Sequence, residues 1–444
     1  MRQISTLRIP TGTLRIGVRI LVLGLISGAM TGCVPAYEAR LESARQRGDL
    51  EAAAELLARA GERAPDDPVL RREQGILAYE RGDPQAARDF LAKSLEQMPN
   101  DPRAMIYAGA ASERAELWDE ATERYDQLGG RELDPAVSTG VDCQWAAVDE
   151  KRLSSLVAAR LAAEESGELP PPTRILMLPF TAPQQGVALN LRIGLAALLA
   201  DDWERVAPPP AVPYTELAAF MVALSVGVDD PIPAETRERL ARLTGARYVV
   251  EGQLSELNDL VSVAPVLIDR AGTSGPQEWR LEYRQSRVAT LVDLERTLVF
   301  HIANALELAL PTAGQEGMRL FAAESGVAIA LYGEAIRLQQ AGDRAGTIER
   351  LDRSLGLDPD FRPAQVARVK LDDCAAVAGD PSALLATFNA AAAREKEQGA
   401  ARELLAATTA ANDRVGGAEG EGKDLSLNRP AASGSTSFVV RVPR

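Results

Sequence analysis

The spacing of apolar residues changes three times along the chain, and each change predicts a boundary. Residues 20–30 form a predominantly apolar run. From residue 34 to 133, apolar residues recur at intervals of three and four, which is typical of amphipathic helices. A short continuous apolar run at residues 175–180 introduces strand-like segments, and helical spacing returns after residue 312. The pattern therefore predicts a helical region, a central α/β domain and a second helical region.

The first helical region repeats itself with a step near 34 residues. Asp-Pro pairs begin at Asp67, Asp101 and Asp134. Glycines, alanines and large residues also recur about every 34 residues, although Leu41 and Glu116 stand where glycine is expected. The recurring positions are Gly48 and Gly82; Gly75 and Gly109; Ala53, Ala87 and Ala121; and Leu57, Leu91 and Tyr125. This set resembles the tetratricopeptide (TPR) repeat, a pair of antiparallel helices, and implies about three repeats within residues 33–136.

A TPR array builds a superhelix whose concave face comes from the first helix of each pair. Matching the groove positions of the family predicts a set of partner-binding residues. An ordinary solvated helix surface is the competing interpretation for each of them. The predicted groove residues are Arg72, Tyr79, Ile106, Glu113 and Arg114.

The middle of the chain predicts an α/β domain with a mixed sheet. Residues 137–172 are expected to hold a linking helix (146–165) and a stiff Pro-rich boundary. Beyond them, the pattern predicts a strand at 175–180 and three more at 248–254, 260–269 and 278–287, with a turn at Gly272 and Gly275 between the last two. Helices are expected at 188–203, 235–243 and 291–310. Pro265 cannot donate to a sheet ladder, so it predicts an edge position or a bulge.

These segments also carry a resemblance. The sequence ILMLPF at 175–180, a helix with Gly194, LARLTGARYVVEGQL at 240–254 and VLID at 266–269 occur in the order of the TolB-like amino-terminal domain. An aromatic segment at 279–283 and the closing helix continue the match across residues 173–311. The resemblance implies a role in protein interaction or assembly and no catalytic centre.

Helical repeats return in residues 312–412. Ala335, Gly342, Thr347, Leu351 and Pro359 match the phase of the first array, so residues 328–360 predict one further repeat. The Ala-rich residues 361–412 are less regular and predict a degenerate repeat with capping helices. Residues 413–444 are rich in Gly, Ala, Ser and acidic residues and are expected to be disordered. The fold class expected is multidomain α and α/β: a TPR α-solenoid, a TolB-like α/β domain with a mixed sheet, and C-terminal TPR-like helices.

The amino terminus predicts export and lipid attachment. Four arginines and no acidic residue precede the apolar run, which is too short for a bilayer span, and Thr31-Gly32-Cys33 follows it. Residues 1–32 therefore resemble a bacterial lipoprotein signal, with Cys33 as the lipidated residue. Met30 departs from the usual leucine, and an ordinary secretory signal is the alternative. Val34 is not the aspartate of inner-membrane retention, so we expect an outer-membrane protein facing the periplasm.

The net charge of the chain limits the classes of partner that it can bind. The net charge is −14, and loss of the arginine-rich leader leaves the mature chain near −18. Such a chain repels nucleic acid and anionic membrane surfaces, so we expect no nucleic-acid partner and membrane attachment through the lipid.

Cys143 and Cys374 remain after Cys33. A disulfide and two buried free thiols are both compatible with the sequence.

The sequence offers little for catalysis. His301 is the single histidine, lacks supporting motif residues and is predicted to be partly buried and structural. Residues 417–424 imitate a phosphate-binding loop, but Asp424 replaces the hydroxyl residue and no strand precedes them. Asp201-Asp202 and Asp372-Asp373 are acidic pairs of the kind that is usually solvated. We expect no cofactor, no metal ligands and no enzyme activity.

The function expected is a membrane-anchored envelope lipoprotein that acts as a protein–protein interaction scaffold or assembly factor, with other envelope proteins or peptides as partners. One alternative is a ligand-sensing periplasmic module, which predicts a polar pocket at the carboxyl ends of the strands. A carboxylate-based hydrolase ranks third and predicts acidic residues converging in a cleft.

Overall fold

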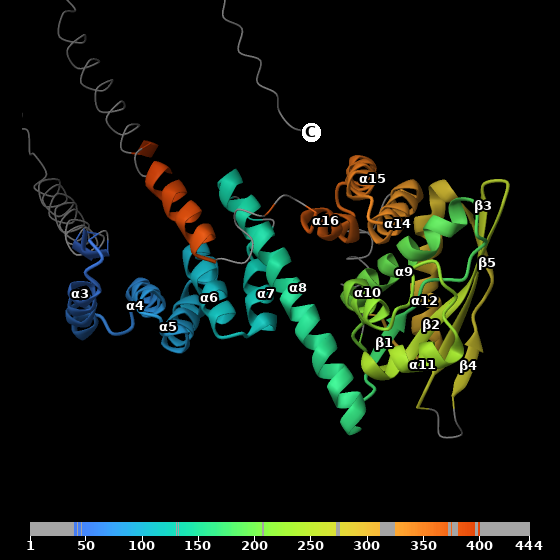
Figure 1. The fold of residues 1–444 in the computed structure, drawn as a ribbon, viewed down its shortest axis with the longest axis horizontal. Helices are drawn as coiled ribbons and strands as arrows, with labels where there is room; N and C mark the ends of the chain where they lie inside the picture. The colour runs from blue at the N-terminus through green and yellow to red at the C-terminus, as the bar shows by residue number, and fades with distance from the viewer. Residues whose placement is uncertain are drawn as a thin grey trace, which may run out of the picture. The chain divides into compact units, whose positions relative to one another are not determined.

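The computed structural model describes residues 40–395, with short gaps, and residues 398–399 (Figure 1). The gaps are residues 42, 46, 130, 132, 207, 272–275, 311–324, 372–373, 375–380 and 396–397. Cys33, the turn at Gly272 and Gly275, and residues 413–444 therefore lie outside the described residues. The chain divides after Phe388 into two compact units, of which the first contains every labelled helix and strand.

The first part of the chain is an array of paired helices, as the 34-residue step predicts. The helices are α3 (Leu50–Arg63), α4 (Pro68–Glu80), α5 (Pro84–Gln97), α6 (Pro102–Arg114), α7 (Trp118–Asp126) and α8 (Pro135–Ser166). The predicted Asp-Pro signals begin α4, α6 and α8, because each Asp caps the helix with its carboxylate and each Pro occupies the first turn. The helical array is thus TPR-like in its architecture.

Small residues let the paired helices approach each other. A Cβ atom on Gly75 would lie 2.6 Å from Leu91, and one on Gly109 would lie 2.8 Å from the Tyr125 ring. Ala87 is fully buried in the same contact region. The small and bulky positions of the repeat therefore face each other across each helix pair, which confirms the interpretation of the repeat.

The turn within each pair requires a left-handed backbone residue. Gly48, Gly82 and Gly342 have φ values of +68°, +79° and +80°. Glu116 occupies the equivalent position before α7 and has φ +58°. A residue with a Cβ atom is strained in this conformation, whereas glycine is not.

We expect Glu116→Gly to stabilise the protein by about 0.5–1 kcal/mol, because relief of the strain outweighs the added freedom of the unfolded chain. Urea unfolding followed by circular dichroism measures the change. Glu116→Ala keeps the Cβ atom and should leave stability close to that of the wild type. Equal effects of the two substitutions would show that the backbone conformation is not the cause.

The linking helix is longer than predicted. α8 was expected at residues 146–165 but begins at Pro135, because Asp134 and Pro135 provide a complete start signal 11 residues earlier. It ends at Gly167, which has φ +78°. Its residues contact α7 in the array and α10, α11 and α16 further along the chain.

The central domain contains a five-stranded mixed sheet. The strands are β1 (Arg174–Met177), β2 (Ala246–Leu257), β3 (Leu260–Asp269), β4 (Gln277–Arg280) and β5 (Arg284–Arg287). β1 is parallel to β2, β2 is antiparallel to β3, and both β4 and β5 pair with β3. The mixed sheet is confirmed, but the strand predicted at 278–287 is two short strands.

Helices α9 (Val187–Val206), α11 (Ala234–Leu243) and α12 (Leu291–Ala305) pack against this sheet. Helix α10 (Tyr214–Ala223) follows the Pro-rich loop and was not predicted. α12 ends five residues before its predicted end, because Glu307 adopts a left-handed conformation (φ +56°).

Pro265 lies in β3, which is an internal strand, so the predicted edge position is wrong. The backbone oxygen of Pro265 accepts a hydrogen bond of 3.0 Å from the Leu281 amide, in the stretch between β4 and β5. The missing amide hydrogen therefore falls where the neighbouring strand is interrupted, and the ladder loses little. On the other side Gly252 pairs with Pro265, and a Cβ atom there would lie 2.4 Å from the Ala264 oxygen.

The predicted C-terminal repeat is present as α14 (Gly326–Gln340) and α15 (Arg344–Leu357), followed by α16 (Arg362–Val369). α14 packs directly on α9 of the central domain. Buried residues on both sides of residue 311 form one hydrophobic core, including Leu198, Ile329 and Tyr332. The two backbones approach closely at Gly333, where a Cβ atom would lie 1.8 Å from the Asn190 oxygen, and at Gly194, where it would lie 2.3 Å from the Ile329 oxygen.

We expect Gly333→Ala to reduce the free energy of unfolding by at least about 2 kcal/mol, because the added methyl group meets backbone that cannot give way. Gly356→Ala is the matched control: it lies in α15 with open space around it and should be neutral or mildly stabilising. Chemical unfolding of both variants with cysteines oxidised makes the comparison. A similar effect of the two substitutions would contradict this packing.

Candidate protein-binding groove

The predicted groove residues lie on α4 and α6, the first helices of two adjacent pairs, which contact each other directly. Arg72 donates hydrogen bonds to Asp101 (2.7 Å) and Glu73 (2.9 Å), and its side chain is 19% exposed. The guanidinium of Arg114 lies 3.8 Å from the centre of the Tyr79 ring and donates a hydrogen bond to the backbone oxygen of Tyr79. Tyr79 in turn packs edge-on against Tyr107.

Three of the five residues are buried. Ile106 is fully buried, and Tyr79 and Glu113 are only 4% and 6% exposed. Glu113 accepts hydrogen bonds from the Tyr125 hydroxyl (2.6 Å) and from the amide nitrogen of Gln144 (2.7 and 2.9 Å). Arg72 and Arg114 retain exposed surface. In this structure Glu113 links α6 to α7 and α8, and it is not free to meet a ligand.

A cluster of arginines surrounds Glu73, which the sequence did not single out. Arg45, Arg72 and Arg103 all form ion pairs with its carboxylate. Burial alone would raise the pKa of Glu73, but these three cations outweigh burial and hold the pKa below its ordinary value. The Glu73 carboxylate therefore has charged partners within the array.

An open cleft of about 1380 Å³ lies elsewhere in the first unit. It is lined by helices α7, α8, α9, α10, α14 and α16 and by the loop before α10, and Cys143, Trp145 and Lys370 contribute to its walls. Lys370 forms an ion pair of 2.5 Å with Asp149 of α8. The walls are helices and one loop, so this cleft is not the pocket at the strand ends that a ligand-sensing module predicts.

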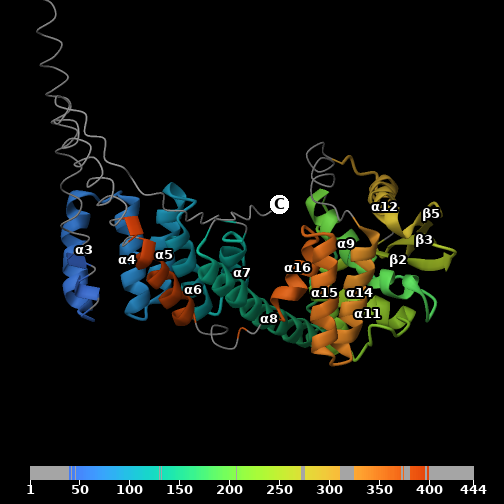
Figure 2. The same ribbon diagram turned by 90° about the horizontal axis from the view of Figure 1, so that it is seen from above.

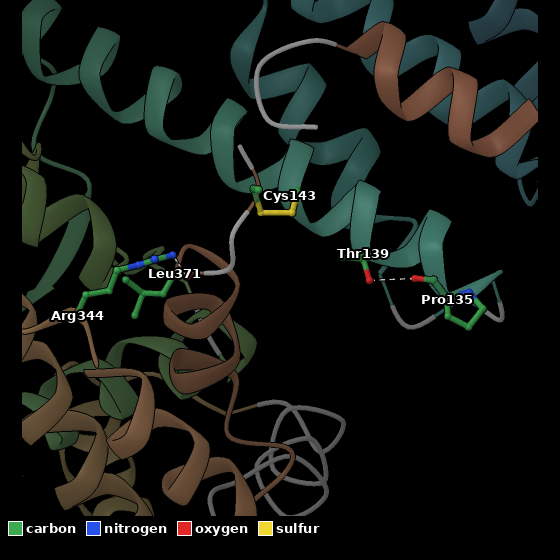
Figure 3. The surroundings of a disulfide bond; sticks show 6 residues. Pro135, Thr139, Cys143, Arg344 and Leu371 are labelled. Atoms are coloured by element: carbon green, nitrogen blue, oxygen red, sulfur yellow. Dashed lines mark hydrogen bonds between the residues drawn. A yellow bond between two sulfur atoms is a disulfide. The ribbon is translucent and has the colours of Figure 1, made fainter. Parts of the chain in front are cut away.

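Cys143 and Cys374 form a disulfide, with Cα atoms 5.4 Å apart. The bond joins α8 to the chain beyond α16, across 231 residues of sequence (Figure 3). Arg344 donates to the backbone oxygen of Leu371 nearby, which holds the end of α16 against α15 (Figure 3). Of the two states compatible with the sequence, the structure contains the disulfide.

Of the other chemistry-bearing residues, His301 and Asp201 have charged neighbours within the fold, whereas Asp372, Asp373 and residues 417–424 lie outside the described residues. His301 is 20% exposed, with its Nε2 atom 3.2 Å from Arg284 and 3.9 Å from Glu282. Asp201 pairs with Arg205 at 2.6 Å. Within the described residues, no group of three His, Cys, Asp or Glu could hold a metal ion, and no helix is long and apolar enough to cross a membrane.

Asp202 of α9 and Glu295 of α12 converge inside the central domain, and both are fully buried. The Glu295 oxygens receive no hydrogen bond from a donor group, so a proton shared with the facing Asp202 is their means of pairing. Burial raises the pKa of Asp202 to about 6. Burial and the Asp202 charge raise the pKa of Glu295 well above its ordinary value. A substrate cannot reach this pair, so it is not the accessible acidic centre that a hydrolase needs.

No protein-family model matches the chain, and no curated protein matches it. Among solved structures, 17 chains match. One is a chain of "Crystal structure of APC/C hetero-tetramer Cut9-Hcn1", with 14% sequence identity and a TM-score of 0.24, covering 77% of this chain and 50% of that chain. The match thus spans half the length of that chain, and at this similarity it carries no argument about function.

We expect the contribution of Asp202 to the stability of the wild type to fall between about pH 4 and pH 6, because the unfolded chain ionises Asp202 at its ordinary pKa while the folded chain keeps it protonated to about pH 6. Asp202→Asn removes this loss. The difference in free energy of unfolding between Asp202→Asn and the wild type should increase by about 1–3 kcal/mol from pH 4 to pH 7, in favour of the variant. Chemical unfolding at both pH values tests this, with pH 4 as the internal reference. A difference that stays constant with pH would contradict it.

Proposed function

We propose that this chain is a lipid-anchored scaffold that binds other proteins at a membrane of the bacterial cell envelope. The observation that carries the proposal is the TPR-like helical array, because stacked helix pairs present an extended surface suited to another polypeptide. The TolB-like resemblance of residues 173–311 supports an assembly role.

The disulfide supports an exported location. Structural disulfides persist in oxidising compartments such as the periplasm and are rare in the reducing cytosol. The Cys143–Cys374 bond is compatible with the secretory leader at residues 1–32. Lipid attachment at Cys33, in a chain of strongly negative charge, would give a membrane attachment that electrostatics alone could not.

Arg114 is the groove residue best suited to contact a partner, because it is exposed and stacks on a buried tyrosine that fixes its position. Arg72 is partly exposed at the same helices. Stacked arginines contribute to interfaces through both their flat face and their charge.

We expect affinity purification of the full-length protein from its own membranes, after mild crosslinking, to recover a defined set of envelope proteins. Cys33→Ala should deplete that set and release the protein from the membrane fraction. Arg114→Glu should weaken recovery, whereas Arg59→Glu, on the exposed surface of α3, should not. Wild-type location of Cys33→Ala would overturn the anchor, and recovery of no protein by the wild type would overturn the scaffold.

A further inference from the structure

Helix α6 is buried on every side. All ten residues from Ala104 to Glu113 are buried, including those on the face that the array leaves to a partner. Helices α4, α5 and α7 contact α6, and Gln144 of α8 donates to its Glu113, so these four helices account for part of this burial. A helix at the surface of an array normally keeps an exposed face, so something further covers α6.

The covering segment comes from the end of the first compact unit. Residues 381–388 are helical, and Leu384 and Leu385 are 0% and 5% exposed. In both Figure 1 and Figure 2, the start of the orange helix that follows residue 380 lies beside α6. The sequence predicted capping helices here, and gave no signal that this one returns to the first array.

The chemistry of this segment fits the surface it covers. Its sequence, PSALLATF, contains no charged residue. Leu384 and Phe388 are one helical turn apart, and Leu385 lies beside them, so the three form one apolar face. Two charged side chains at this place already have partners within the array: Arg72 binds Asp101 and Glu73, and the Glu113 carboxylate accepts hydrogen bonds from Tyr125 and Gln144. The surface therefore favours an uncharged apolar helix over an acidic or basic peptide.

The disulfide keeps the segment near the array. Cys374 is bonded to Cys143 of α8, and seven residue steps separate it from Pro381. An extended chain of that length reaches about 25 Å at most. Even when it leaves α6, the segment therefore stays at a local concentration of order millimolar. A partner has to compete with it.

We propose that residues 381–388 are a built-in competitor that occupies the docking position of a partner helix on α6. This inference rests on the proposed scaffold function and names its partner class: an uncharged amphipathic helix that presents two adjacent leucines and an aromatic residue one turn later. Release of the segment opens the surface to that helix, and the Cys143–Cys374 bond sets how strongly the segment competes.

The test uses the oxidised full-length protein in detergent and a fluorescent peptide of residues 381–395 as the probe. Leu384→Asp/Leu385→Asp should bind the peptide at least tenfold more tightly than the wild type, because two buried charges expel the chain's own segment. Ala386→Asp is the matched control: its position is exposed on the same helix, so it should bind as weakly as the wild type. A peptide carrying the same two Leu→Asp changes should not bind.

Two further measurements keep the result independent of a folding defect. Cys143→Ser/Cys374→Ser loosens the competitor without touching α6 and should bind the peptide several-fold more tightly than the oxidised wild type. Hydrogen exchange should become faster in α6 of Leu384→Asp/Leu385→Asp and remain unchanged in α9 and α14. Equal peptide affinity for the wild type and the double aspartate variant, or no binding to either, would overturn the competitor.

The peptide-binding experiment and the affinity purification can fail independently of each other. If the peptide fails to bind the opened variant while the full-length protein still recovers envelope proteins through Arg114, the scaffold stands and the helix-competitor inference is wrong. If the peptide binds as expected and no envelope protein is recovered, the surface exists and the scaffold function fails.

Discussion

The close contact between α9 and α14 determines where the second half of this chain lies. Gly194 and Gly333 remove two side chains from this contact, so the backbones of the central domain and the C-terminal repeat can touch. The contact fuses their interiors into one hydrophobic core. With α14 fixed, α15 and α16 follow in sequence, and the end of α16 reaches α8 through Lys370 and Asp149. Cys374 then lies within bonding distance of Cys143. The contacts that α16 and Cys374 make with α8 therefore depend on the absence of a side chain at Gly194 and at Gly333.

The sequence predicted the local structure well where a periodic signal repeats. Asp67, Asp101 and Gly82 each specify a cap or a turn by their own chemistry, and the structure has each in that role. The strand pattern predicted the mixed sheet, but Pro265 was expected at an edge or a bulge, because its tolerance in an internal strand depends on an interruption of the neighbouring strand 16 residues away. α10 was missed because its apolar residues face both the core and the cleft, which obscures helical periodicity.

The candidate groove was less predictable than the fold. Family positions placed the predicted groove residues on the first helices of two adjacent pairs, yet Ile106, Tyr79 and Glu113 are buried by contacts that no local pattern encodes. Glu113 looks like a surface acid in sequence, and its hydrogen bonds to Tyr125 and Gln144 come from two later helices. The segment at residues 381–388 was expected to be helical, but its location depends on the disulfide and on α16, which are tertiary features.

The disulfide also changes the covalent connectivity of the chain. It closes a ring of 231 residue steps that includes most of α8, the whole central sheet, helices α9 to α12 and helices α14 to α16. In the chain-entropy description, closing a ring of this size lowers the conformational entropy of the unfolded chain. This adds about 5 kcal/mol to the free energy of unfolding. A single proteolytic cut anywhere inside the ring leaves two fragments that remain covalently joined, so the array and the C-terminal helices stay one molecule after a break in the backbone between them.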